Sequence, residues 1–483
     1  MSAQAGADAL RLGGNAVDAA IAAMLTAFSC EPLLTGLGAG GYMLVVEPGR
    51  EPVLLDFFIE APGQGADVAA RAELVPISVS FGDAVQVFNI GPASVGTYGM
   101  AAGVSEAANR FGRISLAELV APAARLAREG VELNVPQAYV IEILAGIVTS
   151  TPECAALFAP GGRLVGPGDV LRQPELADTL ERLGAEGPAP FYTGDIAAAV
   201  VEWLAEWGGI VTSADLAEYA LVAREPIRAS YRGREVLTNP PPSAGGILIA
   251  HALALLDAEP APPSLEDVVA TMEQTQALRT PEFLEGLDDQ EFVSRFLTRR
   301  SPLGSTTHVA VLDRDGWACS VTCSNGSSSG VVVPGTGIHL NNMLGEQDLN
   351  PLGFHRHPPG RRMPSMMSPT AVLRKGAPEL VLGSAGSNRI RSAILQTILR
   401  VVDDGLEAGD AVRAPRVHFE DGVVYAEPGV DTAPLERAGR AVARFRELNL
   451  FFGGVQAAER DEQGRFSGGG DPRRGGAAIV IWE

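Results

Sequence analysis

The sequence predicts a mixed fold of helices and strands, α/β (α+β), around a large core. Apolar residues recur at helical spacing in segments such as 104–129, whereas 307–312 and 317–323 alternate and read as strands. The chain has 483 residues, 46% hydrophobic and 20% charged, a balance typical of globular proteins. At this length we expect up to about three domains or one large α/β unit.

The overall charge and the N-terminal sequence argue against several classes of partner and location. A formal net charge of -21 disfavours binding to nucleic acid or to an anionic membrane surface. The sequence has no run of eighteen consecutive apolar residues, so we expect no transmembrane helix. The start, MSAQAGADALRLGGN, lacks a basic region leading into a hydrophobic stretch, so it is not recognisable as a secretory signal. We therefore expect a cytoplasmic protein, unless a leader has been removed.

Neither the cysteines nor the histidines predict a metal site. Cys319 and Cys323 are four residues apart on one expected strand, roughly 13 Å by strand rise, which is too far for a disulfide. His355 and His357 lie in a loop rich in proline and glycine with no third ligand nearby, so we interpret this HxH as an ordinary loop. No metal or organic cofactor is expected. A reducing compartment suits the four cysteines, which are Cys30, Cys154, Cys319 and Cys323.

The N-terminal region predicts a broken helix followed by strands. Residues 3–30 have helical spacing that is interrupted at 13–15. The GLGAGG run at 36–41 superficially suggests a phosphate-binding loop, but such a site needs a strand, then glycines, then the start of a helix. Here the segment after the glycines is itself strand-like, so we interpret the run as a close-packed backbone passage. Strands are expected near 42–47 and 53–57.

The middle of the chain is predominantly helical. Helices are expected within 104–129 and at 173–184, 194–207, 212–220 and 247–257, with Thr212 and Ser213 as a plausible cap. Residues 259–304 are rich in charge and proline, which favours exposed helices and linker.

A β-hairpin is predicted where Asp315-Gly316 separates the segments 307–312 and 317–323, because a DG dipeptide between alternating segments is a hairpin signal. A tip at Arg314 and Asp315 places Thr306 opposite Cys323, beside Ser324 and Asn325. Thr306 would then start a strand in the middle of the chain, with polar side chains across from it.

Thr306 has two interpretations on its residues alone. A threonine hydroxyl is a weak nucleophile that its own α-amine can activate as base, and that amine exists only if the bond between Ser305 and Thr306 is cut. The first interpretation is an autocatalytic N-terminal nucleophile, in which the Thr306 hydroxyl attacks the Ser305 carbonyl. The second is an ordinary β-branched strand residue, which is more common for a Thr-Thr pair.

The C-terminal third predicts an anion-binding turn between a strand and a helix. A strand at 371–382 leads through GSAGSN at 383–388 into a helix at 389–402, the order that lets backbone N–H groups bind an anion or form an oxyanion hole. A simple tight turn with Ser387 or Asn388 as helix cap is equally consistent. Further strands are expected at 331–340, 423–426 and 477–482, and a further helix at 434–448.

The sequence resembles the γ-glutamyltransferase (γ-glutamyltranspeptidase) family of N-terminal nucleophile hydrolases, and the likeness runs nearly end to end. The resemblance implies a four-layer αββα sandwich, cleaved by the protein itself into a large subunit, 1–305, and a small subunit, 306–483. It also implies an enzyme acting on small-molecule or peptide amides. It rests on seven segments in the family's order: LGGNAVDAA at 12–20, GLGAGGYML at 36–44, NPPPS at 239–243, TTH at 306–308, LNNM at 340–343, MMSPT at 366–370 and GSAGS at 383–387.

The resemblance also implies roles for particular residues. Thr306 is similar to the family's nucleophile, and Gly386 with Ser387 to its oxyanion hole, although the usual second glycine is here a serine. Ser324 resembles the hydroxyl residue that orients the nucleophile. Asn325 and Glu346 fall at or next to positions that hold the α-amino end of a glutamyl group.

Two departures concern the α-carboxylate of that glutamyl group. The family usually grips it with an arginine, where this chain has Phe58, so a strong charge-assisted contact is replaced by an apolar ring. The serine pair that helps to seat the carboxylate is Pro364-Ser365, which keeps one hydroxyl. Arg361 and Arg362 just before it are either a replacement cation or, as we favour, surface arginines.

Three functions remain open. The first is a γ-glutamyl amidohydrolase or transpeptidase of the glutathione type, which transfers the acyl group from Thr306 to water or an amine; Glu346 favours it. The second is an acylase on the same scaffold that acts on glutaryl or other side-chain amides; Phe58 favours it. The third is a non-catalytic relative that serves as a binding protein, and the retained Thr306 argues against it.

Overall fold

The computed structural model describes residues 1–66, 71–80, 85–278, 306–347, 349–350, 353–386 and 388–482. The chain forms two compact units, and we describe each by itself. Unit 1 comprises residues 1–42, 55–223 and 323–363, and unit 2 comprises 43–54, 224–322 and 364–483. Each unit therefore takes residues from both sides of Thr306.

A packed group of helices dominates unit 1. Helix α2 (Ala16–Cys30) is buried on all sides and packs against α1 (Ser2–Arg11), α3 (Met100–Phe111) and α4 (Leu116–Glu129), and α4 packs against α8 (Pro174–Glu186). The predicted break at 13–15 is confirmed. Asn15 caps α2 there, and its side chain and that of Asp18 each accept hydrogen bonds from the other's backbone.

Short elements complete unit 1. Thr212 caps α11, as predicted, by accepting a hydrogen bond from the Asp215 N–H at 3.1 Å. The strand predicted at 331–340 is wrong: glycines at 335 and 337 adopt positive φ and divide it into two short paired strands, β12 and β13. The remaining elements are β3 (Val75–Ser80), β4 (Val85–Ile90), β5 (Val131–Glu132), α5 (Val135–Ile143), α6 (Ala145–Val148), α7 (Pro152–Phe158), β6 (Val170–Leu171), α9 (Ala189–Tyr192), α10 (Asp195–Glu206), α11 (Ser213–Glu218), β12 (Val332–Val333) and β13 (Ile338–His339).

Unit 2 is built on a six-stranded sheet in which neighbouring strands are antiparallel, in the order β20-β19-β15-β14-β9-β8. The single strand predicted at 371–382 is in fact the hairpin of β14 and β15, which turns at Lys375 and Gly376 because both adopt positive φ. The six strands are β8 (Ile227–Tyr231), β9 (Arg234–Thr238), β14 (Thr370–Arg374), β15 (Ala377–Ala385), β19 (Gly454–Arg460) and β20 (Phe466–Gly470).

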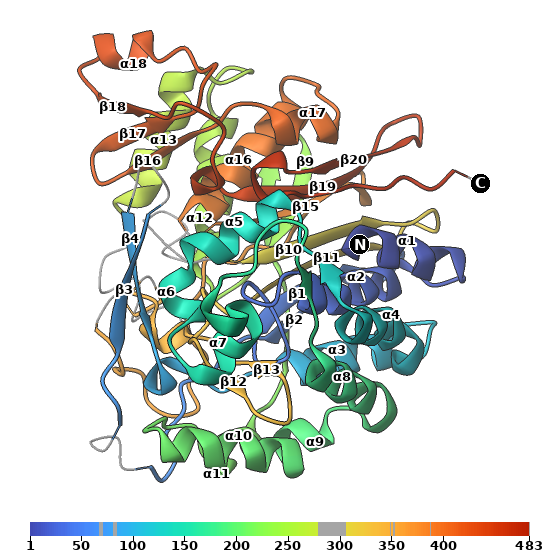
Figure 1. The fold of residues 1–483 in the computed structure, drawn as a ribbon. Helices are drawn as coiled ribbons and strands as arrows, with labels where there is room; N and C mark the ends of the chain where they lie inside the picture. Colours follow the sequence, from blue (N-terminus) through green and yellow to red (C-terminus); the bar gives the residue numbers. More distant parts are fainter. Residues whose placement is uncertain are drawn as a thin grey trace. The chain divides into compact units, whose positions relative to one another are not determined.

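Three layers follow one another within unit 2. Helices α12 (Ala244–Asp257), α16 (Arg389–Val402) and α17 (Ala408–Arg413) pack on one face of the six-stranded sheet (Figure 1). Strand β10 (Thr307–Leu312) packs against β15 and β19 from the other face. The start of β10 is thereby held against the strand that ends at the GSAGSN loop.

Strand β10 belongs to a second sheet with the order β10-β11-β1-β2-β7. The predicted hairpin of β10 and β11 is present, but its turn has three residues, 314–316, because Gly316 adopts φ 91° and Asp313 N–H donates to the Trp317 carbonyl at 3.1 Å. The register therefore differs by one residue from the prediction. The other strands are β11 (Ala318–Ser324), β1 (Gly40–Val46), β2 (Val53–Phe57) and β7 (Val222–Arg224).

The C-terminal predictions are partly wrong. The segment predicted as a helix at 434–448 contains only the short α18 (Ala433–Arg437), followed by β18 (Ala441–Arg444), which pairs with β17 (Val423–Ala426) beside β16 (Val417–Glu420). The strand predicted at 477–482 forms no regular structure. Helix α13 (Leu265–Gln276) lies within the segment predicted as exposed, yet it buries one face. Among the described helices, none has the length and hydropathy needed to cross a membrane.

Candidate active site

Thr306 lies directly before β10, and its residue is only 1% exposed. Its Oγ1 is buried and has no hydrogen-bond partner among the residues that the structure describes. Buried polar atoms normally have partners, because leaving one unsatisfied costs about 1–3 kcal/mol. The hydroxyl is therefore free of hydrogen bonds to the described residues, as a nucleophile that must attack a carbonyl would be. Ser305, the other residue of the predicted cleavage site, lies outside the described residues.

His308 lies on β10, two residues after Thr306, and contacts the strands β11 and β15. Its Nδ1 lies 2.8 Å from the Thr322 hydroxyl on β11. Its ring fills the space over Gly383 on β15, where an added Cβ would lie 2.4 Å from the ring. Burial lowers the pKa of His308 to about 3, so the ring is neutral at physiological pH. His308 thus serves as a neutral packing and hydrogen-bonding residue.

The buried His308 predicts acid sensitivity. The unfolded chain takes up a proton near pH 6.5, whereas the folded ring stays neutral until about pH 3, so stability falls as pH decreases through this window. The test compares His308→Gln with its parent, both in the uncleaved Thr306→Ala background. When the pH falls from 7 to 5, the free energy of unfolding should decrease by about 2 kcal/mol less in the His308→Gln protein than in the parent. Denaturant titrations at both pH values measure the difference. Equal losses in the two proteins would contradict it.

Gly386 forms the turn between β15 and α16, in the strand, loop and helix order that the sequence predicts. It adopts φ 116°, and its carbonyl accepts a hydrogen bond from Arg389 N–H at 3.1 Å as the helix begins. Ser387 lies outside the described residues. Asn388 is fully buried, and neither polar atom of its side chain has a partner among the described residues, so its side chain does not cap α16. The alternative in which Asn388 caps the helix is therefore wrong.

Ser365 is buried in unit 2, and its backbone is tightly held. Its hydroxyl accepts a hydrogen bond from Met367 N–H at 3.0 Å. Its carbonyl accepts from Ala244 N–H at 2.8 Å and from the Ser243 hydroxyl at 3.0 Å. The NPPPS and MMSPT motifs thus pack together, and they fix the position of the Ser365 hydroxyl.

Three predicted site residues come together in unit 1. Ser324 Oγ accepts a hydrogen bond from Gly326 N–H at 2.7 Å, which closes a tight turn after β11. Glu346 is buried, and its Oε1 lies 3.5 Å from the Ser327 hydroxyl in the same turn. Asn325 is fully buried, and both polar atoms of its side chain are without partners among the described residues.

Asn342 was not predicted to contribute, although it stands in the LNNM motif. Its Oδ1 accepts from Ser327 N–H at 2.9 Å, and its Nδ2 donates to the Ser327 hydroxyl at 3.0 Å. It therefore holds the turn that carries Ser324 and Asn325 beside Glu346. The doubled asparagine in that motif was the available signal.

Phe58 and Arg362 are the two residues that bear on the expected contact to an α-carboxylate. Phe58 is fully buried, and its ring stacks on Tyr42 at 5.3 Å between centroids. Arg362 is not a surface arginine, as we had favoured, because only 7% of its side chain is exposed. Nor is it a spare cation, since it pairs with Asp56 at 3.5 Å and Glu60 at 3.2 Å.

The Arg362 guanidinium also supports the backbone at Phe58. It donates to the Phe58 carbonyl and, at 2.6 Å, to the Tyr219 hydroxyl, and it lies 4.9 Å from the centre of the Tyr219 ring. Burial raises the pKa of Glu60, and the charge of Arg362 offsets part of that rise. Of the two arginines that the sequence offered as a replacement cation, Arg362 is therefore engaged in holding the 56–60 segment.

Removing the Arg362 charge should destabilise the protein strongly. Arg362→Met leaves the buried Asp56 and the partly buried Glu60 without their cation, and breaking a buried pair in this way costs about 3–5 kcal/mol. Thermal unfolding measures the loss. As a matched control, Arg128→Met removes an arginine that pairs with two acids on the exposed surface and should leave the melting temperature nearly unchanged. Equal melting temperatures for both variants would contradict the expectation.

Comparisons with known proteins identify the family of the chain. The model of the gamma-glutamyltranspeptidase family matches residues 2–283 and 261–481. The chain is 30% identical over 536 residues to the glutathione hydrolase proenzyme of Bacillus subtilis strain 168, covering 100% of this chain and 90% of that protein. It is 31% identical over 521 residues to the acylase ACY 1 proenzyme of Pseudomonas sp. strain SE83, covering 100% and 92%.

A solved structure extends the likeness to the fold. The crystal structure of cephalosporin acylase from Bacillus halodurans matches with a TM-score of 0.84 and 27% identity, covering 100% of this chain and 94% of that one. Fold and sequence together define an enzyme of the N-terminal nucleophile class, with mixed helices and sheets. The chain belongs to the gamma-glutamyltranspeptidase family. The resemblance found from the motifs is thus confirmed, as is the prediction of an amidohydrolase or acyltransferase of this type.

Proposed function

We propose that the protein matures by cutting its own chain before Thr306 and then hydrolyses or transfers γ-glutamyl-type amides through an acyl-enzyme on Thr306. The observation that carries the proposal is that Thr306 Oγ1, directly before β10, is buried and has no hydrogen-bond partner within the described ranges. Within unit 2 this strand packs against β15, which ends at the loop containing Gly386. We infer that a further helical layer completes a four-layer αββα sandwich.

Maturation proceeds by an acyl shift. The Thr306 hydroxyl attacks the Ser305 carbonyl, the bond to the Thr306 nitrogen breaks, and an ester replaces the amide. Water then hydrolyses the ester, which releases a carboxylate on Ser305 and a free α-amine on Thr306. The products are a large subunit, 1–305, and a small subunit, 306–483. The new amine is the base that the hydroxyl lacked.

Catalysis repeats the same chemistry on an external amide. The Thr306 amine accepts the hydroxyl proton while Oγ1 attacks the substrate carbonyl, and the N–H groups of Gly386 and Ser387 bind the resulting oxyanion. The proton passes to the leaving amine, and an acyl ester remains on Thr306. Water or an acceptor amine then resolves the ester. A backbone N–H donates whatever the side chain, so serine at 387 is compatible with this role.

The turn in unit 1 supports recognition of an amino group. Glu346 offers a buried carboxylate, and the Asn325 carboxamide has no partner in the described part of the chain. A glutamyl ammonium would donate to the Glu346 carboxylate and to Asn325 Oδ1. Ser324 would orient the nucleophile, and Ser365 would contact the acyl head group. These assignments rest on the family motifs and on the burial of each side chain.

A second candidate function is an acylase that acts on glutaryl or other side-chain amides. Phe58 is buried against Tyr42 and Arg362 is neutralised by two acids, so neither residue supplies the cation that an α-carboxylate needs. Two similar proteins are themselves named acylases. The nucleophile and the oxyanion loop would serve this reaction unchanged.

The choice between these substrates is testable with a matched pair of anilides. We expect turnover of γ-glutamyl anilide to exceed that of its glutaryl counterpart, because Glu346 and Asn325 would bind the ammonium that the glutaryl compound lacks. The kcat/KM values of both compounds measure the preference. Glu346→Gln should reduce the preference by about tenfold, since it removes a charge-assisted contact. A clear preference for the glutaryl anilide in the wild-type enzyme would instead establish the acylase.

A further inference from the structure

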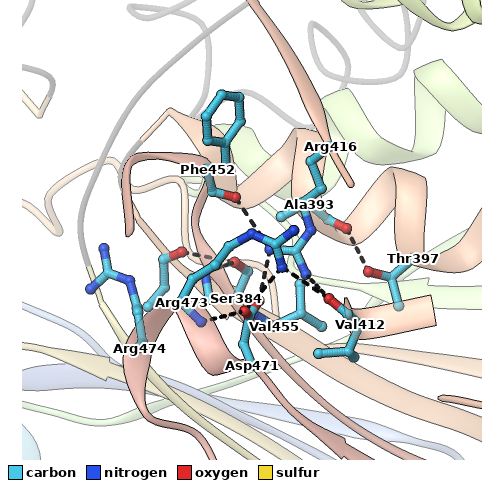
Figure 2. Close-up of polar contacts among 12 residues, drawn as sticks. Ser384, Ala393, Thr397, Val412, Arg416, Phe452, Val455, Asp471, Arg473 and Arg474 are labelled. Carbon is cyan, nitrogen blue, oxygen red and sulfur yellow. Dashed lines mark hydrogen bonds and ion pairs between the residues drawn. The ribbon is translucent and has the colours of Figure 1, made fainter. Parts of the chain in front are cut away.

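Four charged side chains form a buried cluster in unit 2 that the proposed chemistry does not use. The Asp471 cluster consists of Arg416, Glu427, Asp471 and Arg473, whose side chains are at most 2% exposed. Both guanidinium groups meet at Asp471 (Figure 2), Arg416 at 2.7 Å and Arg473 at 3.1 Å. Arg473 also pairs with Glu427. Two cations and two anions thus balance each other away from solvent.

The cluster holds the backbone on both sides of Gly453. Arg416 donates to the Phe452 carbonyl at 3.3 Å, and Asp471 accepts from Val455 N–H at 2.8 Å (Figure 2). The side chains that make these two hydrogen bonds, Arg416 and Asp471, are also the two members of the ion pair. The pair therefore clamps the chain from 452 to 455. The Val412 carbonyl accepts from both arginines and ties the clamp to the helix α17.

Gly453 is the residue against which the predicted oxyanion loop rests. A Cβ added to Gly386 would lie 2.5 Å from the Gly453 Cα, so the two backbones are in direct contact. A Cβ added to Gly453 would lie 2.9 Å from the Ala385 carbonyl oxygen. Ser384 adds a hydrogen bond, accepting from Gly454 N–H at 3.2 Å. Movement of residues 452–455 would therefore move Gly386.

Burial makes this clamp rigid. Burial by itself would raise the pKa of Asp471, but the charges of Arg416 and Arg473 outweigh it and lower the pKa, so Asp471 stays ionised at neutral pH. Water does not reach a buried ion pair, so its members have no water molecules to bind in place of each other. The buried pair holds one geometry, whereas a surface pair exchanges.

We propose that the Arg416 and Asp471 pair is a positioning device that sets the conformation of the oxyanion loop through Gly453. Neither side chain touches substrate. The proposal deepens the proposed function and rests on it, because it assumes that Gly386 N–H binds the oxyanion. It predicts that damage to the pair lowers the rate of the chemical step rather than the affinity for substrate.

Asp471→Asn tests the proposal, because it keeps the shape of the side chain and removes its charge. We expect kcat for γ-glutamyl anilide, or for the glutaryl anilide if that is preferred, to fall by about tenfold to a hundredfold, since small misplacements of catalytic groups cost that much. KM should change by less than about twofold. Rates are expressed per mature active site, counted by mass spectrometry of the acylated small subunit. Arg416→Lys, which keeps the charge but loses the forked contact, should lower kcat in the same direction.

Glu379→Gln is the matched control. Glu379 lies on the same strand, β15, where it pairs with Arg234 at 2.8 Å and Arg374 at 2.6 Å. It is seven residues before Gly386, roughly 23 Å away along the strand. This variant should lose thermal stability and keep its kcat.

The outcomes separate the two proposals. If wild-type protein never acylates Thr306, the proposed function fails. If wild-type protein acylates Thr306 while Asp471→Asn and Arg416→Lys keep the wild-type kcat, the positioning role alone is refuted. A kcat that falls as much in Glu379→Gln as in Asp471→Asn would also refute it, because general destabilisation would then explain both. Should Asp471→Asn not fold, the comparison of Arg416→Lys with Glu379→Gln decides in the same way.

Discussion

Thr306→Ala is expected to remain a single chain, whereas the wild-type protein separates into fragments 1–305 and 306–483. Alanine has no hydroxyl to attack the Ser305 carbonyl, so neither the ester nor the free amine can form. Amidase activity should fall by more than about a thousandfold, because the same atom is the nucleophile in both reactions. Denaturing electrophoresis and N-terminal sequencing of the smaller fragment, which should begin Thr-Thr-His-Val, measure the cleavage.

The control for this variant is Thr306→Ser, which keeps a hydroxyl at the same position. It should cleave itself, more slowly than the wild type, and retain measurable turnover. Thr306→Ala should also unfold at close to the wild-type temperature, since Thr306 Oγ1 makes no hydrogen bond to the described part of the chain that the substitution would break. A fully active wild-type enzyme whose bond before Thr306 is still closed would overturn the mechanism.

The sequence was a good guide wherever local pattern and tertiary environment agree. The capped break before Ala16 and the capped start of α11 were predictable because their signals lie within four residues of each other. The hairpin of β10 and β11 was predictable from its alternation, but its register depended on whether Gly316 or Asp315 closed the turn. That choice is made by the backbone conformation of one glycine.

Other features depend on distant parts of the chain. Strand β20, Phe466–Gly470, contains three consecutive glycines and has no strand signal of its own; it forms because β19 pairs along its length. Arg362 follows Arg361 in a polar stretch, and its burial is explained only by Asp56, Glu60 and Tyr219, which lie far away in sequence. The site motifs were visible in the sequence because each is local, whereas the Asp471 cluster joins residues 416 to 473 and has no local pattern.

Gly386→Ala should nearly abolish turnover. The residue adopts φ 116°, a conformation that L side chains rarely adopt, and its new Cβ would lie 2.5 Å from the Gly453 Cα. The atom that the new Cβ would meet, the Gly453 Cα, belongs to the backbone of the clamped segment 452–455. It therefore cannot move aside as the end of a flexible side chain would. The loop must shift instead, and loss of one oxyanion donor costs about a hundredfold to a thousandfold in kcat. Steady-state kinetics on the preferred anilide, per mature active site, measures the effect.

Gly376→Ala separates conformational strain from packing. Gly376 also has positive φ, 82°, but an added Cβ there meets nothing within 4 Å. The substitution should cost about 1–2 kcal/mol of stability through backbone strain alone and leave kcat unchanged. If Gly386→Ala behaves like Gly376→Ala, losing stability and keeping its rate, then the Gly386 amide does not bind the oxyanion. If only Gly386→Ala loses its rate, the contact with Gly453 matters because it determines where that amide points.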